Sequence, residues 1–154
     1  MSKRYAVSDA TQTTNTTTSK TIAVVGTTTG AGVIRPAIYD VIVGTTGTPA
    51  DNAMRYGVQR FTAAGTTTAK TPSALDPGDV AALAVCGVDA SIEPTKTAAM
   101  ILVDIPANQR ASFRWVAAPD GELKGIGTTA NGLAVTSLSP AYTGATFATV
   151  HFYE

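Results

Sequence analysis

The stretch with the strongest chemical signature is rich in glycine, VGTTTGAG at residues 25–32, and directly follows an apolar run. Glycine-rich turns after a strand cradle phosphate groups in nucleotide-binding proteins. A phosphate-binding loop also needs Lys-Ser or Lys-Thr after its last glycine, and a dinucleotide-binding fold needs a helix there. Here Pro36 follows, and proline opposes a helix. The stretch therefore predicts a β-turn and no nucleotide site.

The single histidine, His151, lies in the apolar segment TVHFY at 149–153. An imidazole can act as a general base, but a histidine–nucleophile pair also needs an orienting carboxylate. Nothing in the sequence points to such a carboxylate. We therefore expect a hydrogen-bonded strand histidine, and no residue of the chain is predicted to be catalytic.

A metal site is not predicted either. One histidine and one cysteine cannot form the paired spacing of a zinc site. Asp76 with Asp79, and Asp120 with Glu122, offer oxygen atoms to calcium, but these are few and lie where turns favour aspartate. Cys86 has no cation near it in the sequence, which is typical of a small buried hydrophobic residue. We expect no metal and no cofactor.

The single tryptophan, Trp115, has two interpretations. On an exposed strand it would be a stacking platform for a sugar, whereas large aromatic side chains in strands usually belong to the core. We favour the core, with Arg114 on the other face of the strand. The residues expected between two facing sheets are Ile38, Ile42, Ile101, Val103, Phe113, Trp115, Val135 and Val150.

The composition favours strands over helices. Threonine occurs 26 times in the 154 residues, beside 14 glycines and 8 prolines, and only 14% of the residues are charged. Threonine is β-branched and suits a pleated surface. The 11 basic and 11 acidic residues are not segregated, so we expect no nucleic-acid partner. No apolar run has the length of a membrane span or of a secretory signal, and we expect a soluble protein made in a cytoplasm.

Apolar runs of strand length recur, each bounded by turn residues. They predict strands at 21–25, 33–43, 53–61, 97–105, 111–118, 132–138 and 145–153. Glycine and asparagine predict hairpin corners at 44–47, 119–121 and 130–132. Residues 73–88 fit an irregular loop with a short turn of helix. Seven or eight short strands predict an all-β fold, a jelly-roll-like sandwich or barrel.

The first 20 residues are predicted to be an extended N-terminal arm, followed by one domain at 21–154. The segment DATQTTNTTTSK at 9–20 has too few apolar side chains to offset the entropy of its ordering. Arg4, Tyr5 and Val7 are the expected partner-binding residues, because Tyr5 and Val7 share one side of an extended segment that can add to a partner's sheet edge. On this hypothesis the arm is dispensable for folding. A disordered tail is the alternative.

Seven short sequence segments, which we call phrases, follow one another along the chain. They are RPAIYD (35–40), TPADN (48–52), QRFTAAGT (59–66), LDP (75–77), EPT (93–95), NQRASFRW (108–115) and APDGEL (118–123). In these phrases the sequence resembles small virion structural proteins of tailed bacteriophages that decorate or cement the capsid. The resemblance implies a jelly-roll-like domain that binds the major capsid protein on the virion surface as a homo-oligomer, a trimer or a dimer.

Two other classes would share this composition. A phage tail-tip or fibre domain, or a carbohydrate-binding jelly roll, differs from a capsid protein in its copy number per virion. An enzyme is the third class, but the sequence lacks both a general acid–base set and a nucleophile set.

Overall fold

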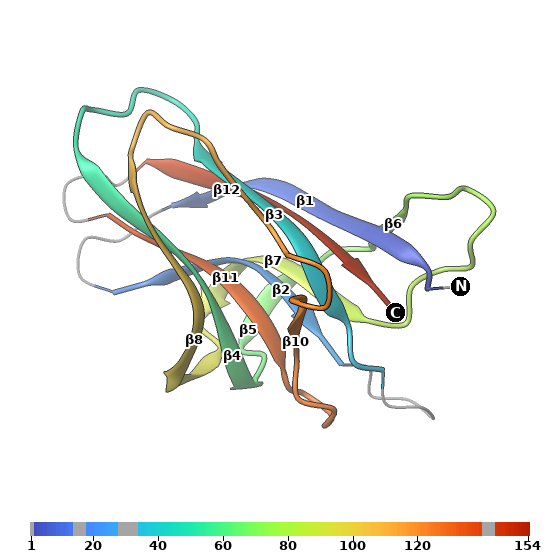
Figure 1. The fold of residues 1–154 in the computed structure, drawn as a ribbon. Coiled ribbons are helices and arrows are strands. Elements are labelled where there is room, and N and C mark those ends of the chain that lie inside the picture. Colours follow the sequence, from blue (N-terminus) through green and yellow to red (C-terminus); the bar gives the residue numbers. More distant parts are fainter. Residues whose placement is uncertain (1, 14–17, 28–33, 140–143) are drawn as a thin grey trace.

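The computed structural model describes residues 2–13, 18–27, 34–139 and 144–154, and it contains no helix in these ranges (Figure 1). Within these ranges, twelve strands form two sheets with antiparallel pairing. Sheet A has the spatial order β10 (Leu123–Lys124), β3 (Ala37–Thr45), β12 (Ala145–Tyr153), β1 (Arg4–Thr13) and β6 (Ser73–Ala74), and β9 (Phe113–Val116) also pairs with β3. Sheet B has the order β5 (Thr66–Ala69), β7 (Val85–Ile92), β2 (Lys20–Gly26), β11 (Gly132–Leu138), β4 (Ala53–Ala63) and β8 (Thr95–Asn108).

The two sheets pack face to face, so the predicted all-β, jelly-roll-like sandwich is confirmed. Each of the seven predicted strands has its counterpart, in β2, β3, β4, β8, β9, β11 and β12. The strands that sequence patterning missed are β1, β5, β6, β7 and β10. Three of these, β5, β6 and β10, have two to four residues, too few to show a period.

The main core lies between the sheets as a contiguous cluster of buried side chains, and Val24, Phe61 and Ala134 form a second, smaller buried cluster. In β12 burial alternates strictly, with Ala148, Val150 and Phe152 inward. The ring of Tyr5 from β1 stacks on Phe152, with the ring centroids 5.6 Å apart. This is the period of two expected for strands with one face in a core.

The interpretation of residues 1–20 as an arm outside the domain is wrong for residues 4–13. These residues form β1, which pairs with β12 over its length and with β6 at Tyr5 and Ala6. Tyr5 and Val7 are buried in the core. Tyr5 and Val7 were expected to pack on a partner's sheet. They pack into the chain's own core instead, and the burial of these two apolar side chains stabilises the strand on the domain. Residues 14–17 lie outside the described residues.

Two local expectations also need correction. The short turn of helix expected within residues 73–88 is absent: a turn follows β6, and β7 begins at Val85. None of the three predicted hairpin corners joins two strands that pair with each other: residues 44–47 and 130–132 connect the two sheets, and residues 119–121 connect β9 with β10, both of which pair with β3. At two of these sites the positive φ falls on Asp120 (61°) and Ala130 (65°) rather than on the adjacent glycines. At the third site the positive φ is that of Gly47.

The core residues expected from the sequence divide into three groups. Ile38, Val135 and Val150 are fully buried, as predicted. Partly buried positions are Ile42, on the outer face of sheet A, and Val103 and Trp115, which pack against the core cluster. Ile101 and Phe113 are 50% and 40% exposed, and for them the prediction is wrong. Both lie on strands at the edge of a sheet, β8 and β9, where one flank has no neighbouring strand to cover it.

Candidate functional site

A β-bulge in β3 brings two consecutive side chains to the outer face of sheet A, which faces away from sheet B. Opposite His151 and Phe152, β3 places Asp40 and Ile38, so Tyr39 is the extra residue. Bulges re-aim side chains in this way. Ile38 remains in the core, while Tyr39 and Asp40 both contact His151.

Asp40 is the centre of a hydrogen-bonded triplet. Arg114 donates to its carboxylate from Nε at 2.9 Å and from a terminal nitrogen at 2.7 Å, and His151 Nδ1 lies 3.0 Å from it. The Asp40 side chain is only 3% exposed. The hydrogen bond from Arg114 holds the pKa of Asp40 below its ordinary value; burial opposes this shift, and the bond to His151 adds to it. The ionised carboxylate makes Nδ1 of His151 the donor, which leaves Nε2 free to face a ligand.

Three rings lie beside this triplet, with Tyr39 next to both His151 and Tyr153, and we call them the aromatic row. The centroid of Tyr39 is 6.0 Å from that of His151 and 6.2 Å from that of Tyr153, and the ring planes differ by 19° and 24°. The guanidinium of Arg4 lies over Tyr39, 5.6 Å from the ring centroid. Burial and then the nearby Glu122 carboxylate raise the pKa of Tyr153.

The Asp40–His151 pair has the geometry of an oriented general base. Ser8 and Thr149 carry hydroxyls two positions further along the same face, but they hydrogen-bond to each other at 2.9 Å. In the described part of the chain, no hydroxyl or thiol is bonded to His151. The pair is therefore suited to binding through hydrogen bonds and ring contacts rather than to activating a nucleophile.

Next to the aromatic row, the surface is hollowed into an open depression of about 920 Å³. We call it the terminal depression, because residues near both chain ends line it. Its lining residues are Ser2, Lys3, Arg4, Leu75, Asp76, Asp79, Glu122 and Tyr153. Both members of one acidic pair that was weighed as a calcium site, Asp76 and Asp79, lie here, together with Glu122 of the other pair. Even so, no group of three His, Cys, Asp or Glu side chains that could hold a metal ion is found among the residues that the structure describes.

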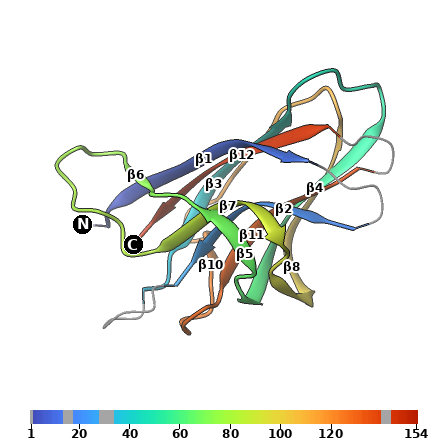
Figure 2. The ribbon, with the colours of Figure 1, turned by 180° about the vertical axis from the view of Figure 1, so that it is seen from behind.

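Residues 70–84 form a loop that projects beyond the chain termini (Figures 1 and 2). It is held firmly against the domain, and we call it the pinned loop. Its hydrogen bonds to the domain run from Leu75 N to Arg4 O (2.9 Å), from Tyr5 Oη to Val80 O (3.0 Å), and from Leu83 N and Ala84 N to the Glu154 carboxylate (3.0 and 2.6 Å).

The pinned loop nevertheless turns large apolar side chains toward solvent. Leu75 is 50% exposed, Val80 61% and Leu83 59%. Val85, the residue after the loop, is also exposed. Scattered apolar side chains on a surface are ordinary, whereas large contiguous apolar patches mark surfaces that bind other molecules.

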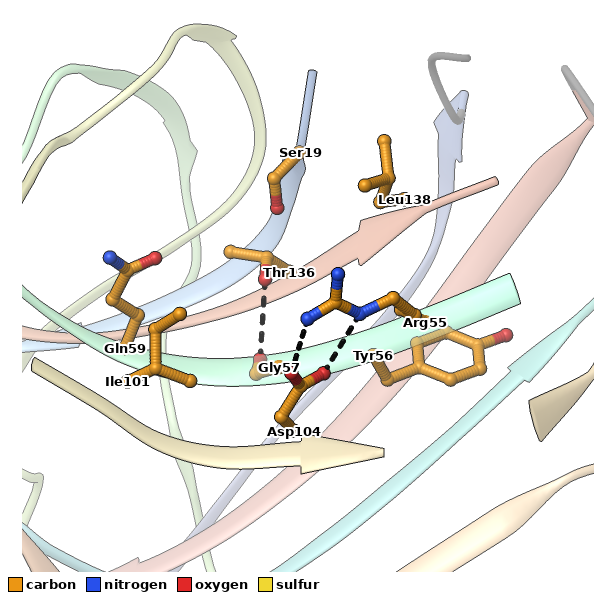
Figure 3. Close-up of a pocket in the computed structure, with 9 residues that line it drawn as sticks. All are labelled: Ser19, Arg55, Tyr56, Gly57, Gln59, Ile101, Asp104, Thr136 and Leu138. Atoms are coloured by element: carbon orange, nitrogen blue, oxygen red, sulfur yellow. Dashed lines mark hydrogen bonds and ion pairs between the residues drawn. The ribbon is translucent and has the colours of Figure 1, made fainter. Parts of the chain in front are cut away.

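A smaller pocket of about 160 Å³ lies on the outer face of sheet B (Figure 3). Its floor is Gly57, where a side chain would meet Thr136 Oγ1 at 3.1 Å. On one side an ion pair between Arg55 and Asp104 borders it. The remaining lining residues include Ser19, Gln59, Ile101 and Leu138. The two polar groups of the ion pair satisfy each other, so this pocket offers a hollow in the sheet and no free charge.

The structure places the predicted partner-binding residues in two environments. Tyr5 and Val7 are buried in the core and do not offer a surface. Arg4 is exposed and lies over Tyr39.

Trp115 packs partly buried against the core, which agrees with the preferred interpretation. Cys86 is buried, and burial raises the pKa of its thiol to about 12.

The sequence analysis missed the link between Asp40 and His151. The two residues are 111 positions apart and meet only because β3 and β12 pair. The expectation that His151 is a hydrogen-bonded strand residue is confirmed, but its carboxylate partner had no local signal. A bulge is likewise invisible in the hydrophobic pattern, since Tyr39 and Asp40 read as opposite faces of a regular strand.

No helix in the described ranges is long and apolar enough to cross a membrane. No protein-family model, no curated protein and no solved structure matches the chain.

Proposed function

We propose that the protein is a virion structural protein that binds the outside of a tailed-bacteriophage capsid and stabilises it. In this proposal its partners are the major capsid protein and further copies of itself in a homo-oligomer. It is made in the host cytoplasm and ends on the virion surface. The resemblance of seven phrases to capsid decoration and cement proteins motivates the proposal, and the pinned loop supplies the physical argument.

The observation that carries the proposal is the combination of rigidity and apolar exposure in the pinned loop. Ordering a loop on binding costs free energy, and a loop already fixed by hydrogen bonds avoids most of that cost. Burying a Val or Leu side chain contributes about 1.5–3 kcal/mol. Val80 and Leu83, both more than half exposed, therefore suit a partner with an apolar surface. Many copies on one lattice add their contacts, so each contact need not be strong.

Several of the phrases that carry the resemblance hold the fold together. The side chain of Gln109, in the sixth phrase, is fully buried: it accepts from Ala50 N at 3.2 Å and donates to Ser139 Oγ at 3.0 Å. Its backbone N–H donates to Asn52 O at 2.9 Å, so the second and sixth phrases form one joint. The joint therefore fixes these two loops relative to each other.

The test is capsid binding by a double variant, Val80→Ser with Leu83→Ser. Both side chains point to solvent, so the variant should melt like the parent, while its affinity for purified capsids that lack the protein should fall at least about ten-fold. Ile92→Ser is the matched control, because Ile92 is 63% exposed but lies at the far end of β7. Co-sedimentation with capsids measures both.

Two results would count against the proposal. If the double variant decorates capsids as well as the parent does, the pinned loop is not the contact surface. If the parent itself does not bind capsids, and quantitative mass spectrometry of virions finds only a few copies, the protein belongs to the tail instead. Hundreds of copies per virion are expected for a capsid protein.

A further inference from the structure

The triplet around Asp40 holds the polar groups beside the aromatic row in fixed positions. Arg114 and His151 both hydrogen-bond to one nearly buried carboxylate, so neither side chain is free to turn. Arg114 uses two of its nitrogens for this contact, and its side chain remains 62% exposed. Its other N–H groups and His151 Nε2 are therefore ready to meet a ligand without further ordering.

The surface beside these groups is concave. Arg4 and Tyr153 belong both to this cluster and to the lining of the terminal depression. A ligand that lies along the aromatic row therefore has room to continue into the depression, where Glu122 offers a carboxylate.

The charges of this surface select the class of ligand. The positively charged side chains of this surface and its depression are Lys3, Arg4 and Arg114, and the negatively charged ones are Asp40, Asp76, Asp79 and Glu122. Carboxylates outnumber the cationic groups of Lys and Arg, which disfavours a phosphate or sulfate ligand. The surface also contains the aromatic rings of the row, and the guanidinium and carboxylate groups beside them can donate and accept hydrogen bonds. A pyranose has the matching pattern, with apolar C–H groups on its faces and hydroxyls around its rim.

We propose that the aromatic row, with Arg4, Arg114 and Glu122 around it, binds a neutral saccharide. The aromatic row lies on the outer face of sheet A, and Val80 and Leu83, the side chains of the proposed capsid contact, do not line the terminal depression. Saccharide binding therefore does not depend on the capsid attachment proposed above, and it would add a second contact to a protein held on a particle.

The experiment is a titration of the full-length protein followed by ¹H–¹⁵N NMR. The probes are methyl glycosides and short oligomers of glucose, galactose, mannose and N-acetylglucosamine, with sodium sulfate and sodium phosphate as the anion arm. At least one saccharide should give saturable shifts of the backbone amides of Tyr39, His151 and Tyr153, and the anions should give none.

Variants separate a binding role from a structural one. Tyr39→Leu and Tyr153→Leu keep side-chain bulk but remove the ring, and each should weaken the saccharide affinity at least about ten-fold. Phe113→Leu is the control, because this ring is also partly exposed but lies on the other face of sheet A, opposite Val43. Each leucine variant should still bind capsids as the parent does.

The proposal is overturned if no saccharide in the panel gives saturable shifts, if only the anions do, or if both tyrosine variants bind as tightly as the parent. If the tyrosine variants instead lose capsid binding, the row is a protein contact. In that case the capsid proposal survives and the saccharide site does not.

Discussion

Replacing Tyr5 by alanine measures whether the N-terminal segment belongs to the domain. The Tyr5 side chain is fully buried, stacks on Phe152 and donates a hydrogen bond to Val80 O at 3.0 Å. Truncating a buried aromatic ring to alanine costs about 3–5 kcal/mol, and the lost hydrogen bond costs about 1 kcal/mol more. A domain of this size is stable by about 5–15 kcal/mol, so Tyr5→Ala should remove a large part of that stability.

Tyr5→Phe is the matched control. It keeps the ring and its stacking on Phe152 and removes only the hydroxyl, so it should cost about 1 kcal/mol. Equilibrium unfolding in urea, followed by the fluorescence of Trp115, gives both values as shifts of the midpoint at constant slope. The difference between the two variants isolates the contribution of the buried ring.

A small effect would refute the assignment of β1 to the core. If Tyr5→Ala costs less than about 1 kcal/mol, the ring cannot be buried as described, and residues 4–13 would be an arm after all. The same reasoning predicts that a chain that starts at Thr21 will not fold stably, because it would remove the strand between β12 and β6.

Three further predictions follow from individual side chains. Gln109→Ala should cost about 1–3 kcal/mol in urea unfolding, because it leaves the buried Ser139 hydroxyl and the Ala50 N–H without their partner, whereas Asn108→Ala at an exposed neighbour should cost less. Asp40→Asn should destabilise the protein by about 1–3 kcal/mol at pH 7. The pKa of Asp40 is lower in the folded protein than in the unfolded chain, where it is about 3.9. The ionised carboxylate therefore stabilises the fold above about pH 3.9, and this stabilisation is lost as the pH falls through the folded-state pKa. The free energies of unfolding of parent and variant should converge at acid pH. Cys86 should resist iodoacetamide in the native protein at pH 8 and react once the protein is unfolded, as mass spectrometry would show; rapid native labelling would contradict its burial and its raised pKa.

The sequence predicted the fold class because the information for it is local. The alternation in β12 and the apolar runs of β2, β3 and β11 are visible in short windows. What it did not predict depends on long-range contacts. The strand β1 carries only two large apolar side chains, and it is ordered because β12, 141 residues away at the Ser8–Thr149 contact, lies beside it.

The candidate site was less predictable than the fold for the same reason. Arg4, Tyr39, Arg114 and Tyr153 come from four different strands of sheet A, and the sequence shows no spacing that relates them. Strand pairing and one bulge bring them together around Asp40. Sequence analysis could name Arg4 and His151 individually, but their shared surface depends on the register of β3 with β12.

The seven phrases contain residues that stabilise the fold, whereas the residues of the proposed partner contact lie outside them. Gln109 closes a joint between two loops, Glu93 in the fifth phrase accepts hydrogen bonds from Thr21 and Lys96, and Arg35 in the first donates to Gly125 O at 3.2 Å. These hydrogen bonds hold the loops in place. A resemblance in these residues is therefore evidence for a shared fold. Val80 and Leu83 lie outside every phrase, and they are among the most exposed apolar side chains that the structure describes. On the proposed function, proteins with the same phrases and different residues at these two positions should share the sandwich and differ in the capsid that they bind.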